Sequence, residues 1–367
     1  MKFTRRDLIP LAGAGLVAGY AGLRTKASPP QRLPGPSAVA VVKAASYSDD
    51  LVSRMLEGIR ECGLDVRGRK VLLKPNLVEF DPATCINTNV AVVAAALEVF
   101  RKLGAADVVI GEGPGHRRDT YALAEMARYR SEISKFDTHF VDLNRDDVSP
   151  IEGFADRGEI YLPNTALRAD LIVSLAKMKT HHWAGATLSM KNFFGLVPGS
   201  VYGWPKNELH HVGIDRSIVE LNRIFRRSFA IVDGIVGMEG NGPIQGTPRP
   251  VGVLVMGGDL PAVDATCCRI MGIDPARVEY LRNSSDRLLM AAPSWVSYGL
   301  DGDNGTSRWQ AREIIFSATR KHADQEKILG RAEAQGLLAL ELHRVDGDDP
   351  ARSRHPRALD RGHSAFQ

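Results

Sequence analysis

The chain has 367 residues, of which 44% are hydrophobic and 25% charged, and its 47 basic and 43 acidic side chains give a net charge of +4. A chain of this length can bury a substantial core in one large domain or in two smaller ones. No compact run of Lys and Arg is interleaved with aromatic residues, so the composition favours neither nucleic acid nor an anionic membrane surface as a partner.

The N-terminus has the pattern of an export signal. A TRRDL motif at residues 4–8 precedes an apolar, glycine-rich stretch over residues 8–23. This stretch is too short and too rich in glycine to favour a spanning helix. We therefore expect a twin-arginine signal peptide over residues 1–27, read by the twin-arginine export machinery and either cleaved or kept as an anchor. The expected location is periplasmic or otherwise extracytoplasmic, with no spanning membrane helix in the mature form.

Beyond a proline-rich linker over residues 28–37, strand and helix patterns alternate along the chain. Short apolar runs predict buried strands, and apolar residues repeated every three or four positions predict helices. The expected strands cover residues 38–43, 70–74, 107–110, 138–143, 171–175, 229–232 and 251–256, and the expected helices cover 51–62, 90–102, 120–136, 215–226 and 261–271. This alternation predicts an α/β domain over residues 38–315, with a mostly parallel sheet, helices on both faces and successive βα units.

Other segments are expected to be irregular. Residues 144–168 are polar, and residues 238–246 have the composition of a turn. Residues 199–213 contain aromatic, proline and histidine residues and are expected to form a loop or lid over a site. Residues 316–367 contain few apolar residues towards their end, which predicts a helical and partly disordered C-terminal tail.

Ionisable and amide side chains recur where the expected strands end. Ligands of open parallel sheets bind outside the carboxyl ends of the strands, where the loops meet. Lys177, Lys179 and His181 occupy alternate positions, so an extended backbone would place them on one face. The candidates at the strand ends and in the segment that follows the fifth strand are Lys74, Asn76, Glu112, Lys177, Lys179, His181, Lys191, Asn192, Asp233 and Asp259.

The gathering of lysines predicts a cleft for a small anionic ligand, a carboxylate or phosphate compound. Like charges at a strand end repel one another unless something negative lies among them. We expect Lys74, Lys177, Lys179 and Lys191 to bind this ligand. The alternative for each single lysine is a stem that covers the edge of the sheet while the ammonium group stays in water.

Enzymatic activity with a divalent metal is a second hypothesis. His181, Asp233 and Glu239 supply imidazole and carboxylate ligands, although no metal-binding spacing such as H-E-x-x-H occurs. His181 would act as acid or base because imidazole titrates near neutral pH, with Lys179 and Asp233 as further catalytic candidates. The sequence contains no G-x-S-x-G motif, so it gives no indication of a serine hydrolase. The GEGPG turn at residues 111–115 lacks the spacing of a dinucleotide site.

The four cysteines give no metal motif. Cys62, Cys85, Cys267 and Cys268 contain no C-x-x-C spacing, so neither a structural zinc nor an iron-sulfur cluster of the ferredoxin type is expected. An oxidising compartment would permit a disulfide between Cys62 and Cys85. The adjacent Cys267 and Cys268 are expected to be small buried thiols on a helix.

A series of ordered motifs resembles the domain-of-unknown-function 362 (DUF362) family over residues 38–275. The motifs are LLKPNL (72–77), GEGPG (111–115), DLIVSLAKMKTH (170–181), SMKNFFG (189–195), IVDG (231–234), MEGNGP (238–243) and GGDLPAVDA (257–265). Their matching positions add Asp264 to the candidates already named and include Glu239. Many members carry or accompany a ferredoxin module, which this sequence lacks. The resemblance therefore implies an alternative function, a non-enzymatic accessory or electron-transfer partner of an iron-sulfur protein.

Overall fold

The computed structural model describes residues 37–115, 119–206, 208–285 and 294–297. The expected signal peptide at 1–27, nearly all of the linker and the C-terminal tail at 316–367 lie outside the described residues. The strands are β1 (Ala38–Lys43), β2 (Lys70–Pro75), β3 (Asp107–Glu112), β4 (Phe140–Asp142), β5 (Val148–Glu152), β6 (Glu159–Pro163), β7 (Leu171–His181), β8 (Gly185–Thr187), β9 (Ser228–Asn241), β10 (Gln245–Gly257) and β11 (Ser294–Ser297).

The helices lie between these strands. They are α2 (Leu51–Glu61), α3 (Val90–Lys102), α4 (Thr120–Met126), α5 (Tyr129–Glu132), α6 (Phe136–His139), α7 (Asn164–Leu167), η1 (Lys191–Leu196), α8 (Gly199–Tyr202), α9 (Glu208–His211), α10 (Ile214–Ile224), α11 (Leu260–Ile270), η2 (Pro275–Arg277) and α12 (Glu279–Ser285). Side chains cap several of them, such as Asn89 at α3, whose side chain accepts a hydrogen bond from the Ala91 backbone N–H.

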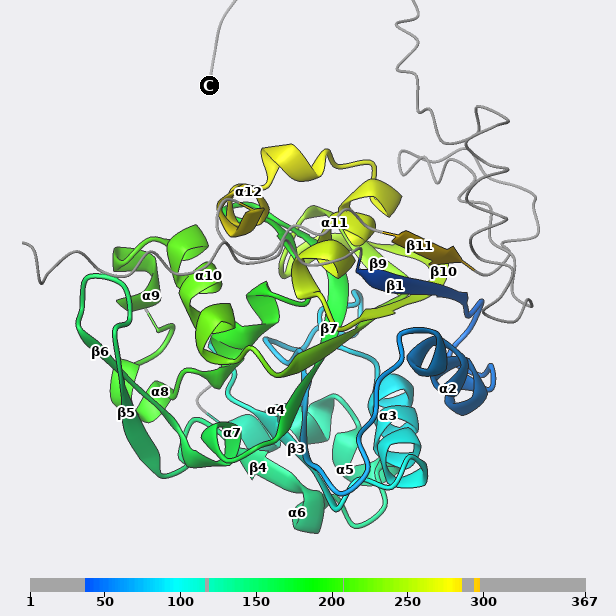
Figure 1. Cartoon of the computed structure of the whole chain (residues 1–367), viewed down its shortest axis with the longest axis horizontal. Coiled ribbons are helices and arrows are strands. Elements are labelled where there is room, and N and C mark those ends of the chain that lie inside the picture. The colour runs from blue at the N-terminus through cyan, green and yellow to red at the C-terminus, as the bar shows by residue number, and fades with distance from the viewer. Residues whose placement is uncertain (1–36, 116–118, 207, 286–293, 298–367) are drawn as a thin grey trace, which may run out of the picture. The chain divides into compact units, whose positions relative to one another are not determined.

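One nine-stranded sheet organises these elements (Figure 1), and its strands lie in the order β11-β1-β10-β9-β7-β2-β3-β4, with β8 paired to β7. The neighbours from β4 to β9 run parallel to one another. β10 is antiparallel to both β1 and β9. The prediction of a mostly parallel sheet is therefore confirmed, with two antiparallel strands, β10 and the short β8, that the sequence pattern did not reveal.

Both faces of the sheet are covered by helices, as predicted. Along β2, Val71 and Leu73 pack in a core with side chains of α2 and α3, which lie against each other in Figure 1. Leu72 points to the other face and packs in a second core with side chains of α10 and α11. Strands buried on both faces need nearly continuous apolar runs, which is why these strands were readable in the sequence.

Other predicted elements differ from the structure. The helix expected over residues 120–136 is divided into α4, α5 and the start of α6, because Arg128 and Lys135 adopt left-handed backbone angles with φ of 67° and 55°. A right-handed helix cannot continue through such residues. The polar segment expected to be irregular contains the antiparallel pair of β5 and β6.

Three strands, β7, β9 and β10, extend well beyond their predicted bounds. β7 continues through Lys177 and Lys179 to His181, where it pairs with β8. β9 continues to Asn241 and pairs with β10 from Gln245 onward, so the turn expected over residues 238–246 is confined to residues 242–244. The predicted ends failed because polar residues in these extensions pair in hairpins instead of leaving the sheet.

The cysteines are free thiols, so Cys62 and Cys85 do not form the disulfide that the compartment would permit. Cys62 lies within 3.5 Å of the carbonyl of Met256, whereas Cys85 lies 3.0 Å from the carbonyl of Gly237. Cys267 and Cys268 are buried on α11, as expected. Among the described residues, no helix combines the length and apolar character that crossing a membrane requires.

Candidate functional site

The order of the strands reverses between β2 and β7. From β2 the chain proceeds to β3 and β4 on one side of the sheet, and from β7 it proceeds to β9 on the other. Such a reversal opens a crevice at the carboxyl ends of the two strands, which is the usual ligand site of open α/β sheets. A cavity of about 390 Å³ lies here, lined by residues from the ends of β2, β3 and β7, by η1, and by two further groups of residues, Pro205, Lys206 and His210 and the β9–β10 turn at 241 and 243–245.

The cavity brings together many of the predicted site residues. Its lining includes Lys74, Asn76, Glu112, Lys179, His181, Lys191 and Asn192. The lining does not include Lys177, Asp233, Glu239, Asp259 and Asp264, although the structure describes all of them. The functional roles of the lining residues remain predictions, whereas their common location is a property of the fold.

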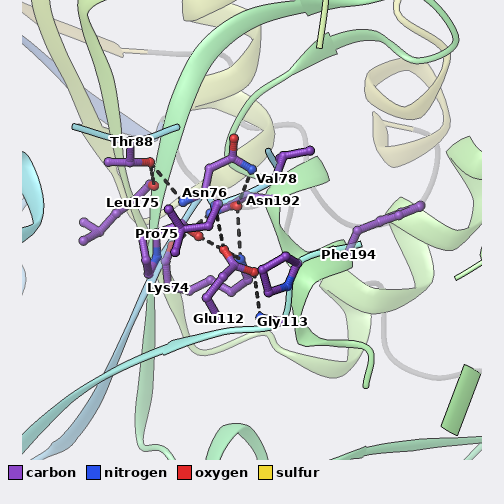
Figure 2. A network of polar contacts seen from close by, with 12 residues as sticks. Lys74, Pro75, Asn76, Val78, Thr88, Glu112, Gly113, Leu175, Asn192 and Phe194 are labelled. Atoms are coloured by element: carbon purple, nitrogen blue, oxygen red, sulfur yellow. Dashed lines mark hydrogen bonds and ion pairs between the residues drawn. The ribbon is translucent and has the colours of Figure 1, made fainter. Parts of the chain in front are cut away.

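A buried ion pair belongs to the lining of the cavity, and Figure 2 shows its network of polar contacts. The Nζ of Lys74 lies 2.6 Å from Glu112 Oε2 and donates further hydrogen bonds to the carbonyl of Pro75 and to Asn192 Oδ1. Glu112 also accepts hydrogen bonds from the backbone N–H groups of Leu77 and Gly113. Each charge is therefore compensated within the protein, as a buried charge must be. This pair holds β2, β3 and η1 together.

Gly195 permits η1 to pass close to this ion pair. A Cβ atom at position 195 would lie 2.1 Å from Glu112 Oε1 and 2.5 Å from Lys74 Nζ. No side chain fits at these distances, so the glycine is required by close approach. The glycine of the SMKNFFG motif thus has a steric explanation.

Two polar atoms of the lining have no hydrogen-bond partner among the described residues. Asn192 connects Lys74 and Ser174, and its Oδ1 accepts a hydrogen bond from Asn76 Nδ2. Asn76 Oδ1 itself is buried without a partner, and so is Thr187 Oγ1. Buried polar atoms are nearly always paired, so these two indicate the position of a missing partner such as a ligand or water.

Three lysines of the lining form no salt bridge with any carboxylate in the described part of the chain. Lys179 donates a 2.8 Å hydrogen bond to the carbonyl of Ile86, and Lys206 donates to the carbonyls of Gly113 and Phe194. The Nζ of Lys191 lies 3.6 Å from the centre of the Phe194 ring. The side chains of Lys179 and Lys206 are buried, and that of Lys191 is half-buried. We call Lys179, Lys191 and Lys206 the unpaired lysines.

Burial and repulsion between neighbouring positive charges lower the pKa values of the unpaired lysines. The pKa of each unpaired lysine is lowered to about 7, with desolvation by burial as the largest cause. The charge of Lys191 also lowers the pKa of Lys179, and the charge of Lys74 lowers the pKa of Lys191 and Lys206. An anion placed among the three would favour their charged forms and raise these pKa values.

His181 is a neutral hydrogen-bond donor in this environment. Burial, followed by the charge of Lys191, lowers its pKa to about 2. Its Nδ1 accepts hydrogen bonds from the backbone N–H groups of Trp183 and Ala184 at 3.1 and 3.2 Å. The proton of the neutral ring is therefore assigned to Nε2 by this network. The expected role as acid or base remains a prediction, but this geometry disfavours the imidazolium form on which an acid would depend.

Sequence reasoning did not identify several residues of the lining. Lys206 belongs to the segment expected to be a lid, and placing that lid over the strand ends would have brought its cation to the site. Thr187 lies opposite Lys179 in the β7–β8 hairpin, so recognising the hairpin would have located it. The ring of Trp183 packs edge-on against His182 and His210, and its side chain is 66% exposed.

Lys177 and Asp233 were predicted to bind ligand and to act in catalysis, but they form a separate buried ion pair. Lys177 Nζ lies 2.9 Å from Asp233 Oδ2 and 2.8 Å from the hydroxyl of Tyr47. Asp233 also accepts a hydrogen bond from the backbone N–H of Asn89. The pairing of β7 with β9 is irregular between Lys177 and Lys179, and only Lys179 lines the cavity.

Asp259 and Asp264, at the start of α11 and within it, were predicted to bind ligand, and the structure places both in structural hydrogen bonds outside the cavity lining. Asp259 caps the helix by accepting a hydrogen bond from the backbone N–H of Ala262. Asp264 accepts hydrogen bonds from the backbone N–H groups of Ser189 and Met190 at 2.8 and 3.0 Å. Burial raises the pKa of Asp264 to about 7. Asp264 thereby fixes the backbone immediately before Lys191.

The predicted metal ligands Asp233, Glu239 and His181 do not assemble into one site. Asp233 is occupied by Lys177 and Tyr47, and Glu239 lies 3.9 Å from Arg249. The Nδ1 of His181 accepts backbone hydrogen bonds. No group of three or more His, Cys, Asp or Glu residues within the described ranges has the geometry to hold a metal ion.

Comparisons with known proteins identify the family but not an activity. A thylakoid-associated protein of Synechocystis is 31% identical over 218 residues, which is 58% of this chain and 65% of that protein. The lactate racemase apoprotein of Thermoanaerobacterium thermosaccharolyticum has 16% identity and a TM-score of 0.43, over 67% of this chain and 59% of that one. A Thermotoga maritima protein has 14% identity and a TM-score of 0.34, over 59% and 58% of the two chains.

The chain thus spans less than two thirds of the length of each of these proteins. The model of a family described as a domain of unknown function, DUF362, matches residues 71–269, which is more than half of the chain. This stretch contains β2, β3, β7 and η1, the elements that build the cavity. The protein belongs to the DUF362 family, as the ordered motifs of its sequence predicted.

Proposed function

We propose that the cavity at the ends of β2 and β7 binds a small anionic ligand, a carboxylate or phosphate compound. The observation that carries this proposal is the set of unpaired lysines, Lys179, Lys191 and Lys206, gathered around one cavity without a carboxylate partner among the described residues. Buried charges are normally paired or neutralised. An anionic ligand supplies the missing negative charge.

The other polar groups of the lining suit the same ligand. The Nε2–H of His181 and the hydroxyl of Thr187 are donors that an anionic oxygen accepts. Asn76 Oδ1 is an acceptor, which favours a ligand that also carries a hydroxyl or N–H group. The cavity volume of about 390 Å³ suits a small metabolite, since ligand sites commonly have volumes of about 300 to 1,000 Å³.

Calorimetric titration of the full chain with inorganic phosphate and, separately, with lactate tests this function. We expect saturable binding of at least one of these anions, with a loss of about 10- to 100-fold in affinity in Lys179→Met, since a charge-assisted hydrogen bond contributes about 1.5–3 kcal/mol. The matched control is Lys102→Met, which removes an exposed lysine that pairs with Glu98 on the surface.

Equal affinities in Lys179→Met and in the unaltered protein would contradict the proposed role of the cavity. Binding of neither anion, together with an iron-sulfur protein that copurifies with the chain, would instead favour the accessory or electron-transfer function. The anion-binding function and the accessory function therefore predict opposite results for the same preparation: anion binding in the first case and a copurified iron-sulfur protein in the second.

We further propose export of the folded protein by the twin-arginine route. The support is the TRRDL motif and the apolar stretch that follows it, and a cleft formed before export suits a machinery that carries folded proteins. In cell fractionation, replacing both Arg5 and Arg6 by Lys should move the protein from the extracytoplasmic fraction to the cytoplasm. An unchanged distribution would rule out this route.

A further inference from the structure

Lys191 differs from the other lysines of the cavity in the freedom of its amine. Lys74 is held by Glu112, Lys179 by the carbonyl of Ile86, and Lys206 by two backbone carbonyls. Within the described residues, Lys191 Nζ donates no hydrogen bond and rests on the face of the Phe194 ring. Once the proton has left, the lone pair of the amine therefore has no hydrogen-bond donor among the described residues.

The backbone that carries Lys191 is fixed although its amine is free. Lys191 begins η1, and the two residues before it are anchored by hydrogen bonds from their backbone N–H groups to Asp264. The next residue, Asn192, is held by Lys74 and Ser174. A nucleophilic side chain needs a rigid backbone attachment and a reactive end that is not bound to other groups, and Lys191 has both.

We propose that Lys191 is a nucleophile that forms an imine with a carbonyl compound bearing an anionic group, of the 2-oxo acid class. This inference rests on the proposed anion site, because Lys179 and Lys206 would hold the carboxylate while the adjacent ketone carbon meets Lys191 Nζ. The lowered pKa of Lys191 supports it, since in the ligand-free protein about half of an amine with a pKa near 7 is neutral at neutral pH and can attack as the keto acid arrives.

The chemistry balances without any additional reactant. The lone pair of the neutral amine attacks the ketone carbon, a C–N bond forms, and the C=O π electrons move to oxygen. The nitrogen loses a proton and the oxygen gains one, giving a carbinolamine. A proton from solvent water then converts the hydroxyl into a leaving water, the C–O bond breaks, and the nitrogen lone pair forms the C=N bond of a protonated imine. The protonated imine is a cation and can take the place of the ammonium group over Phe194.

Trapping with borohydride tests this inference on the full chain. The protein is incubated with pyruvate and sodium borohydride, whose hydride adds to the imine carbon and fixes the adduct as a secondary amine. Peptide mapping by mass spectrometry should locate the adduct on Lys191. Lactate, which has the carboxylate but no ketone, should give no adduct. Lys191→Arg should lose the adduct because its guanidinium does not form the imine, and thermal melting checks that this variant is folded.

The matched control is Lys102→Arg, which alters an exposed lysine outside the cavity and should leave the adduct unchanged. An adduct that persists in Lys191→Arg, or that spreads over exposed lysines, would overturn the proposal. An absent adduct in a protein that binds phosphate would overturn the imine and leave the anion site intact. An absent adduct in a protein that binds neither phosphate nor lactate would overturn both.

Discussion

Lys177 and Lys179 are two residues apart on the same strand, both are buried, and their surroundings are opposite. Lys177 lies 2.9 Å from the carboxylate of Asp233 and 2.8 Å from the hydroxyl of Tyr47. Lys179 has one backbone carbonyl as its partner, and it lines the cavity together with Lys191, whose charge lowers its pKa. Lys177 belongs to a cluster with Asp233 and Tyr47 in which its charge is compensated, and we call this the closed cluster. Lys179 belongs to the polar groups of the cavity that have no such compensation, the unpaired lysines and Thr187, and we call these the open cluster.

This difference separates Lys177, a structural lysine, from Lys179, for which we propose a ligand-binding role. Burial alone does not distinguish them, since both side chains are at most 1% exposed. The distinction is whether the protein supplies the counter-charge, because an uncompensated buried ion is unstable in a protein interior. For Lys179 the described residues supply no carboxylate, and in the proposed function an anionic ligand provides the counter-charge.

The largest effect is expected from breaking the closed cluster. Lys177→Met leaves Asp233 buried without its cation, which should lower the free energy of unfolding by about 3–5 kcal/mol. The matched variant Lys179→Met removes a cation without a carboxylate partner, so it should retain or increase this free energy. Denaturant unfolding of both variants in the absence of ligand measures the contrast. Equal losses of stability would show that the two lysines have equivalent surroundings.

A smaller effect is expected from pH. The unpaired lysines have pKa values of about 7 in the folded protein, and an anion binds best when they are charged. Anion affinity should therefore rise as pH falls through 7 and decrease above it, by up to about tenfold per pH unit for each proton taken up on binding. Calorimetry with lactate at several pH values measures this slope, and a flat profile would contradict uptake of protons by the lysines.

Stability without ligand should follow the opposite trend. Between pH 7 and about 10.4, the ordinary pKa of lysine, the unfolded chain binds more protons than the folded one, so the contribution of these lysines to stability increases with pH. Below pH 7 these lysines are protonated in both the folded and the unfolded state, so through them the free energy of unfolding no longer changes with pH. Denaturant unfolding across this range, repeated with saturating lactate, should show a weaker pH dependence when the anion is bound.

The sequence was sufficient to predict the sheet and part of the site. Strands such as β2 and β7 are apolar on both faces, which makes them readable without knowledge of their neighbours. The rule that ligands bind at strand ends then located Lys74, Lys179 and Lys191 at one cavity. These predictions depend on local pattern and on a general property of parallel sheets.

What the sequence did not reveal depends on contacts between distant residues. Assigning Lys177 to a structural pair requires knowing that Asp233 and Tyr47 lie beside it. The structural role of Asp264 likewise depends on Ser189, which lies on another element of the fold. The sequence gives the charges of these side chains but not their partners in space. It therefore cannot distinguish a buried charge that has an oppositely charged partner from one that has none.

The smallest expected effect concerns Thr187, whose hydroxyl is buried without a partner among the described residues. Thr187→Val removes this unsatisfied group and should stabilise the ligand-free protein by about 1 kcal/mol, while weakening anion binding by about three- to tenfold. The matched control is Thr180→Val in the same hairpin, where the hydroxyl donates a 3.0 Å hydrogen bond to the carbonyl of Gly240. That variant should lose stability with and without lactate. Thermal unfolding of both variants with and without lactate separates the two, because a hydroxyl that serves a ligand is costly only when the ligand is absent. If Thr187→Val also lost stability without lactate, the hydroxyl would have a structural partner, and the open cluster would be limited to its lysines.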